Sequence, residues 1–309
     1  MKVLVAIPAY NEEEQLNYVI QEVKKNISVA FKLLVINDGS SDKTLEVAKK
    51  SGVDFILSSS INHGLAEVFN STKQFFIENN FDYLVFFDAD LQYPPEFIEL
   101  LLEAIIQKDS NIVIGERDFN KNNIFTLNKK ILQRIGSFVV SKISGTTIRD
   151  VTSGFRIYDR SALSAIEITD SYTYTIESIL QAKTKKIKIS SLKLDYFNKT
   201  RQSRLVRSNS HYIKNALKTM GNYFFTYNML FIKQLTLLSS LTISLISFSR
   251  FFIPYFENGS NPGNVQSLIL GSFIIVSSLS LLILMNLRIN YFKMLRIERK
   301  LTHKQHSLD

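Results

Sequence analysis

The segment that decides the fold is FFDADLQYPPE, residues 86–96. It closes an apolar run that we interpret as a buried strand, and this strand stops at two carboxylates, Asp88 and Asp90. Because strand side chains alternate in direction, residues two apart point the same way where the chain stays extended. Paired carboxylates at the end of a strand suit a hard divalent cation that carries substrate phosphates. Alone, an Asp-X-Asp sequence is more often a turn or a helix cap.

Three further polar clusters follow apolar runs that we also predict to be strands. PAYNEE occupies residues 8–13, NDGSSD occupies residues 37–42 and NHGL occupies residues 62–65. Polar clusters at strand ends mark the crevice in which open α/β sheets bind ligands. The four segments, in this order and spacing, resemble the family 2 glycosyltransferases of the GT-A fold. Residues 88–96 are similar to the branch that contains dolichyl-phosphate mannose synthase and the bacterial polyprenyl-phosphate glycosyltransferases.

The hydrophobic pattern predicts a GT-A-like (Rossmann-like) α/β catalytic domain over residues 1–210. Strands are expected near 2–7, 32–37, 53–58, 82–87, 111–115 and 188–197, and helices near 12–25, 42–51, 64–79, 95–107, 122–143 and 172–182. Residues 150–159 read as a turn into a strand or a short helix. Alternating strands and helices imply a mostly parallel sheet covered on both faces.

Beyond residue 210 the sequence predicts attachment to a membrane. Residues 211–227 read as an amphipathic helix that lies in the membrane interface. The remainder, 228–309, holds two stretches long enough to cross a bilayer, at about 229–249 and 265–287, and then a basic tail. The link from Pro254 to Asn264 has no Lys or Arg and both flanks are basic, which predicts that both termini are cytoplasmic. Arg250 departs from this pattern, because it lies at the outer end of the first stretch, where its side chain can reach the interface.

The composition agrees with an intracellular enzyme domain at a membrane. The net charge is +9 and 45% of the residues are hydrophobic. Basic residues crowd into 183–218 and 288–304, beside the apolar stretches, which favours an anionic membrane surface over nucleic acid as a partner. The chain has no cysteine, so disulfides, thiolate metal sites and cysteine nucleophiles are excluded. Met1 leads directly into a strand without an apolar signal region, so we expect the catalytic part in the cytosol.

The family resemblance implies roles for the residues of the donor site. The nucleotide-sugar would contact Pro8, Ala9, Tyr10, Glu12, Asp38, Asp88, Ala89 and Asp90. Asp88, Asp90 and Gln92 would hold a divalent cation, Mg²⁺ or Mn²⁺. For Asp38 there is a simpler interpretation, an Asx turn that caps the helix from Asp42.

The resemblance also implies an acceptor site and a catalytic set. Asp88, Asp90 and Arg117 would be catalytic, and the acceptor phosphate would contact Arg117, Arg134, Ser137, Arg201, Ser203 and Arg204. A solvated basic surface is the simpler interpretation of these cations. Many family members carry Arg-X-X-Gly-X-Ser-Lys near residue 200, where this chain keeps Ser203 but differs at 198, 201 and 204.

Two more family motifs have competing interpretations. SGFR at residues 153–156 matches the family, although Phe155 is equally suited to the core. Glu177 matches a frequent family glutamate, although a position on a helix surface would explain it too.

The function implied by the resemblance is inverting transfer of a hexose from a UDP- or GDP-linked donor to a polyprenyl phosphate. The alternative is a family 2 transferase that acts on a saccharide acceptor at the membrane. A non-enzymatic membrane scaffold is disfavoured because Asp38, Asp88, Asp90 and Gln92 are all intact. The sequence does not identify the sugar, the nucleotide base, the prenyl length, the cation or the pathway. It is also compatible with a homo-oligomer.

Overall fold

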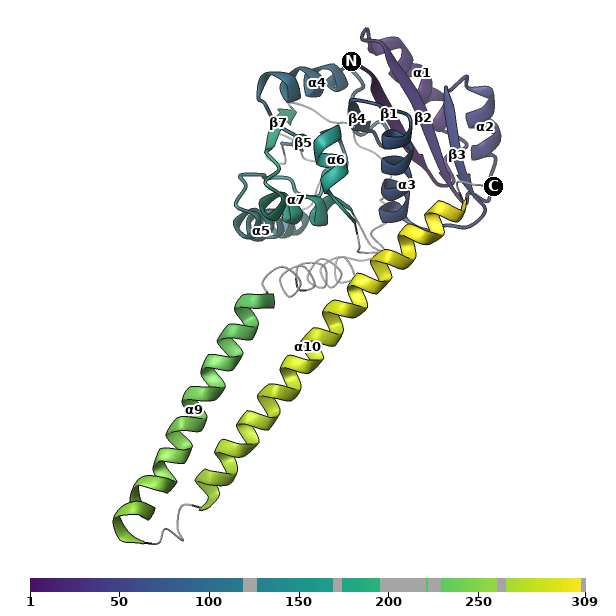
Figure 1. Cartoon of the computed structure of the whole chain (residues 1–309). Helices are drawn as coiled ribbons and strands as arrows, with labels where there is room; N and C mark the ends of the chain where they lie inside the picture. Colours follow the sequence, from purple (N-terminus) through teal and green to yellow (C-terminus); the bar gives the residue numbers. More distant parts are fainter. Residues whose placement is uncertain (119–126, 169–173, 195–220, 222–228, 260–264, 307–309) are drawn as a thin grey trace. The chain divides into compact units, whose positions relative to one another are not determined.

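Seven strands form one sheet in the part of the chain that the structure describes, with the order β3-β2-β1-β4-β6-β5-β7 (Figure 1). The structure is a computed structural model, and it describes residues 1–118, 127–168, 174–194, 221, 229–259 and 265–306. The strands are β1 (Val3–Ala9), β2 (Phe31–Asp38), β3 (Phe55–Ser59), β4 (Tyr83–Phe86), β5 (Ile112–Arg117), β6 (Arg156–Asp159) and β7 (Ile189–Leu194). All neighbouring pairs are parallel except those of β6, so the predicted mostly parallel α/β sheet is confirmed.

The antiparallel strand β6 is the feature that the sequence pattern left open. Residues 150–159 read as a turn into a strand or a short helix, and the structure has both, because α6 (Arg160–Ala165) follows β6 directly. β6 lies between β4 and β5, with Ile157 opposite Val85 on one side and Val113 on the other. Arg156, the last residue of the SGFR motif, therefore pairs with Phe86, the last residue of β4, two residues before Asp88.

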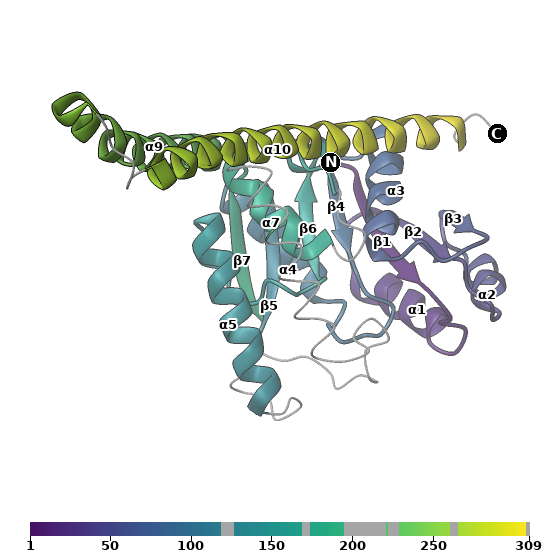
Figure 2. The same cartoon turned by 90° about the horizontal axis from the view of Figure 1, so that it is seen from below.

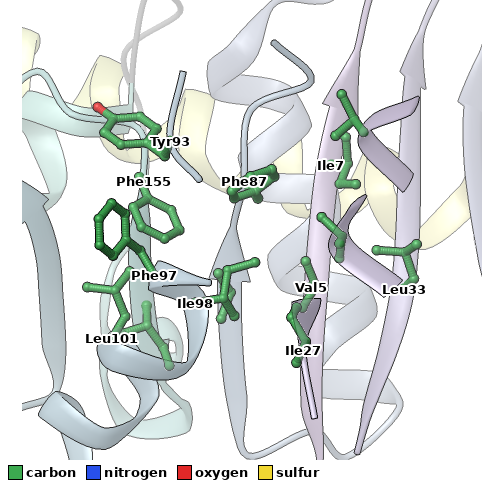
Figure 3. Close-up of a cluster of buried hydrophobic side chains, with 14 of the residues drawn as sticks. Val5, Ile7, Ile27, Leu33, Phe87, Tyr93, Phe97, Ile98, Leu101 and Phe155 are labelled. Carbon is green, nitrogen blue, oxygen red and sulfur yellow. The ribbon is translucent and has the colours of Figure 1, made fainter. Parts of the chain in front are cut away.

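Helices cover both faces of the sheet (Figures 1 and 2). They are α1 (Leu16–Asn26), α2 (Thr44–Lys50), α3 (Leu65–Glu78), α4 (Phe97–Gln107), α5 (Leu127–Ser144) and α7 (Tyr174–Lys185), with α6 as given above. On one face, alternate residues of β1 such as Val5 and Ile7 belong to one buried cluster with α1 and with Leu101 of α4 (Figure 3). On the other face, Phe69 of α3 stacks on Tyr174 of α7 with ring centroids 4.5 Å apart.

The chain divides into two compact units, Met1–Met220 and Gly221–Asp309. In the second unit, α9 (Met229–Asn258) and α10 (Val265–His306) include two apolar segments of membrane-spanning length, Ile232–Glu257 and Val265–Leu287. The first helix continues through Pro254, which the sequence pattern had assigned to the link. Residues 211–227, predicted as an interfacial helix, lie outside the described residues apart from Gly221.

The two long helices pack closely against each other. The Ser244 hydroxyl of α9 donates to the Gly271 carbonyl oxygen of α10 at 3.1 Å. A methyl group at Gly271 would lie 2.8 Å from the Phe248 ring, so only glycine permits this approach. Small residues at a helix–helix contact are typical of membrane-spanning pairs.

Candidate active site

The carboxyl ends of β1, β2 and β4 lie side by side, which brings the predicted polar segments to one edge. Ala9 pairs with Asn37 across β1 and β2, and Ala6 pairs with Phe86 across β1 and β4. Because these strands are parallel, the residues that follow them emerge at the same edge of the sheet. The PAYNEE, NDGSSD and DADLQ segments therefore meet there, as the sequence spacing predicts.

The first segment presents an aromatic ring beside a buried acid. Pro8 and Ala9 end β1, and Tyr10 follows with 40% of its surface exposed. Glu12 is buried, and its backbone N–H donates to the Thr44 hydroxyl at 2.7 Å. The Thr44 contact fixes this segment against the start of α2, while the Tyr10 ring stays accessible.

Asp38 joins the end of β2 to the loop that precedes α3. Its buried carboxylate accepts hydrogen bonds from the backbone N–H groups of His63 at 2.8 Å and Gly64 at 2.9 Å. The Asn62 amide in turn donates to the Asp38 carbonyl oxygen at 3.2 Å. Asp38 thus caps the NHGL loop, whereas the simpler sequence interpretation expected a cap on the helix from Asp42.

Asp88 and Asp90 follow β4, one on each side of the buried Ala89. Burial raises the pKa of Asp88 to about 7, the Asp90 carboxylate adds to this rise, and the nearby Arg117 opposes it. The Asp90 carboxylate accepts from the Gln92 backbone N–H at 3.0 Å, which closes a tight turn after the strand. Since the Asp90 carboxylate raises the pKa of Asp88, a positive ion bound at this pair would relieve the repulsion.

Gly154 leaves the room that the Asp88 carboxylate occupies. A methyl group at Gly154 would lie 2.8 Å from one Asp88 carboxylate oxygen and 3.3 Å from the other. In the described residues no group of three or more His, Cys, Asp or Glu side chains could hold a metal. The two carboxylates fit a hard cation that takes its remaining ligands from substrate phosphates and water, as Mg²⁺ usually does.

Arg117, at the end of β5, connects Gln92, in the loop after the carboxylate pair, to a buried anion. Its guanidinium makes two hydrogen bonds to Asp150, Nε to Oδ2 at 2.6 Å and Nη2 to Oδ1 at 3.0 Å. Its Nη1 donates to the Gln92 side-chain oxygen at 3.0 Å. Burial alone would raise the pKa of Asp150, but the Arg117 guanidinium holds it below its ordinary value. Asp150 is therefore ionised at neutral pH.

A pocket of about 730 Å³ lies on the α5 side of Arg117. Arg117, Arg134 and Ser137 all line it, so the described members of the predicted acceptor set are brought together. Arg134 is exposed, whereas Ser137 is buried and its hydroxyl accepts from the Val151 backbone N–H at 3.3 Å. The other predicted members, Arg201, Ser203 and Arg204, lie outside the described residues.

Comparison with known families decides the class of this site. Residues 4–167, more than half of the chain, match the profile described as glycosyl transferase family 2. The chain belongs to glycosyltransferase family 2. It is therefore a glycosyltransferase, and the resemblance predicted from the DADLQ and neighbouring segments is confirmed.

Named proteins similar to this family 2 glycosyltransferase include lipid-phosphate sugar transferases. A dolichol-phosphate mannosyltransferase of Pyrococcus furiosus is 28% identical over 60% of this chain and 54% of its own length, so the chain spans about half of that relative. An undecaprenyl-phosphate mannosyltransferase of Micrococcus luteus is 28% identical over 54% of this chain and 70% of its own.

A solved structure with the same fold is glucosyl-3-phosphoglycerate synthase of Mycobacterium tuberculosis, in complex with Mn²⁺, UDP and glucosyl-3-phosphoglycerate. It matches 72% of this glycosyltransferase and 78% of its own chain, with a TM-score of 0.56 and 17% identity. At that identity the similarity concerns the fold, and it confirms the predicted GT-A architecture.

Asp150 is a partner of Arg117 that the sequence reasoning missed, whereas Arg156 belongs to the SGFR motif that it singled out. Arg156 is fully buried and donates to the carbonyl oxygens of Ser153, Val151 and Thr175, each within 2.9 Å. Asp150 stands only three residues before the SGFR motif, and this proximity was the available signal.

The remaining two motif residues are both buried. Phe155 packs between Phe87 and Tyr93, with centroid distances of 5.6 and 5.0 Å, so its core interpretation is correct. Glu177 is also buried, which removes the helix-surface interpretation, and it accepts from the Gln181 amide at 3.1 Å.

Proposed function

We propose that this glycosyltransferase moves a hexose from a UDP- or GDP-linked donor to the phosphate of a polyprenyl phosphate at a membrane surface. The printed names of the Pyrococcus and Micrococcus relatives support a lipid-phosphate acceptor. The two apolar segments of spanning length support a membrane location. A soluble saccharide acceptor would not require these segments.

The position of Arg117 carries this proposal. Its Nη1 donates to Gln92, beside the carboxylate pair, and the same residue lines the pocket together with Arg134. A donor diphosphate at the carboxylates and an acceptor phosphate in the pocket would therefore meet at one guanidinium. Arg117 would act on both phosphates through its charge, because its guanidinium already donates to Asp150, Gln92 and Thr152.

The donor half follows from the strand-end residues. Asp88 and Asp90, with Gln92 beside them, would hold Mg²⁺ or Mn²⁺ and through it the donor diphosphate. The nucleotide would lie along Pro8, Ala9, Tyr10, Glu12, Asp38 and Ala89, with the exposed Tyr10 ring against the base. When bound, the cation stabilises the negative charge of the departing nucleoside diphosphate.

The acceptor half requires little proton chemistry from the protein. A phosphate monoester has its second pKa near 6, so its oxygen is mostly ionised at neutral pH. That oxygen attacks the anomeric carbon as the bond to the diphosphate breaks, and the configuration inverts. Arg117 and Arg134, with Arg201, Ser203 and Arg204, would hold the phosphate in line. The protein thus contributes position and charge more than a general base.

The surface of α5 supports an acceptor with a lipid tail. Ile131, Ile135 and Phe138 lie three or four residues apart, on one face, and are 51%, 57% and 70% exposed. The helix carries four basic residues and no acidic one. Phe138 also lines the pocket, so an apolar face leads to the acceptor site. We propose that this face lies at the cytoplasmic membrane surface, as the sequence predicts for residues 211–227, and that both termini are cytoplasmic.

The test is transfer by the full chain in lipid nanodiscs. We expect radiolabel from UDP- or GDP-hexoses to enter the organic-solvent fraction only when polyprenyl phosphate and Mg²⁺ or Mn²⁺ are present. Asp90→Asn provides the inactive control. Label that enters only a soluble saccharide would replace this proposal with the saccharide-acceptor alternative.

A further inference from the structure

Asp150 lies at the junction between the carboxylate pair and the acceptor pocket. Its side chain is fully buried in the loop between α5 and β6. Oδ2 accepts from Arg117 Nε at 2.6 Å and from the Arg117 backbone N–H at 3.3 Å. Oδ1 accepts from Arg117 Nη2 at 3.0 Å, so the guanidinium is held in a two-point contact.

The same carboxylate also holds α5. Oδ1 accepts from the Gln133 side-chain amide at 2.8 Å and from the Thr152 hydroxyl at 2.9 Å. Gln133 directly precedes Arg134 on the helix that forms one wall of the pocket. A carboxylate offers about four lone-pair positions, so five donors saturate it.

The two partners of Asp150 belong to opposite halves of the site. Arg117 also holds the Gln92 side chain in place, because Nη1 donates to the Gln92 side-chain oxygen at 3.0 Å. Gln133 ties α5 to Asp150 one residue before Arg134, which lines the pocket. One buried anion thus fixes the metal-side loop and the acceptor helix relative to each other.

A second anion near Arg117 could compete with Asp150 for its guanidinium. Gln92, which accepts from Arg117 Nη1, also donates its backbone N–H to Asp90, so the guanidinium lies beside the loop that carries Asp88 and Asp90. Without the charge at Asp150, the guanidinium would gain more by pairing with Asp88. A guanidinium at Asp88 would compete with the divalent cation for the same carboxylate.

We infer that Asp150 is a positioning residue that directs Arg117 toward the donor and acceptor phosphates and keeps it off the cation-binding carboxylate Asp88. Its role in transfer rests on the proposed function, but its effect on cation binding does not. The Asp150 side chain is fully buried, so it would act through its partners Arg117 and Gln133. Supporting residues of this kind change metal affinity or activity by about 10–100-fold when they are replaced.

The first test measures Mn²⁺ binding by electron paramagnetic resonance on the full chain in nanodiscs, with UDP and separately with GDP. We expect Asp150→Asn to weaken Mn²⁺ binding about 10–100-fold. Adding Arg117→Gln should restore much of that binding without restoring transfer, because the competing cation is gone. A residue with a merely structural role would make the double variant weaker than the single one.

A control variant and a second test variant keep the inference falsifiable if Asp150→Asn has a much lower melting temperature. Asp109→Asn, which removes an exposed ion pair with Lys188, should change nothing. Gln133→Leu should raise the KM for polyprenyl phosphate about tenfold and leave Mn²⁺–nucleotide binding unchanged. The inference is overturned by a folded Asp150→Asn with normal Mn²⁺ affinity, by a weaker double variant, or by Gln133→Leu affecting both halves equally. If the parent chain glycosylates no polyprenyl phosphate, the proposed function is wrong. The Mn²⁺ measurements still test whether Asp150 affects cation binding.

Discussion

Replacing Gly154 by alanine tests the carboxylate pair without altering its charge. The added methyl group would lie 2.8 Å from an Asp88 oxygen, whereas ordinary contact begins at 3.4 Å, so the carboxylate must retreat by about 0.6 Å. Gly154 is not among the described glycines with positive φ, so alanine meets only this steric conflict. Metal–ligand distances tolerate about 0.2 Å of change. We therefore expect Mn²⁺–nucleotide affinity and kcat/KM to fall about 10–100-fold.

Overpacking of this kind costs about 1–3 kcal/mol of folding free energy, which should leave the protein folded in the assay. Mn²⁺ titration, transfer kinetics and a melting curve would be measured together. Gly136→Ala is the matched control, since a methyl group there meets nothing within 4 Å and alanine favours the helix by about 1 kcal/mol. If both variants bind Mn²⁺ and turn over like the parent, Asp88 does not hold the cation.

Three further changes test other parts of the argument. Asp90→Asn should abolish transfer with little change in melting temperature, as excess chelator should, and an active variant would remove Asp90 from the metal site. Gly39→Ala should lower the free energy of unfolding by more than about 1 kcal/mol, because φ is +67° and the added methyl group would lie 2.3 Å from the Ile61 backbone. Denaturant titration would detect this decrease. In this cysteine-free chain, a fluorophore on Phe138→Cys should be quenched by brominated lipids and one on Tyr18→Cys should not; equal quenching would contradict contact of α5 with the bilayer.

The donor edge of the site was predictable because its signals are local. Each polar segment directly follows an apolar strand, and parallel strands place such segments at one edge without any further information. The Asp88–Asp90 pair and the exposed Tyr10 needed only this rule. Profile similarity to the family then fixed the reaction class.

The junction at Asp150 was not predictable because it depends on pairing across the chain. β6 could be seen as a short apolar run, but its antiparallel place between β4 and β5 is set by the whole sheet. Only that placement brings Gly154 against Asp88 and Asp150 against Arg117. The side chains that hydrogen-bond to a buried carboxylate likewise follow no repeating pattern in the sequence, so they could not be predicted from it.

The place of β6 has a consequence for how the chain acquires its shape during synthesis. β4 and β5 are successive strands, but each pairs with β6, so neither edge is complete until residue 159 has emerged. At about 5–20 residues per second, several seconds separate the end of β5 from that moment. Until then the facing edges of β4 and β5, and the far edge of β5 that later pairs with β7, are templates for pairing with another nascent chain. Ribosome-bound intermediates that end between β5 and β6 should therefore be the most aggregation-prone. Gly154 reaches its place against the Asp88 carboxylate only when β6 has paired.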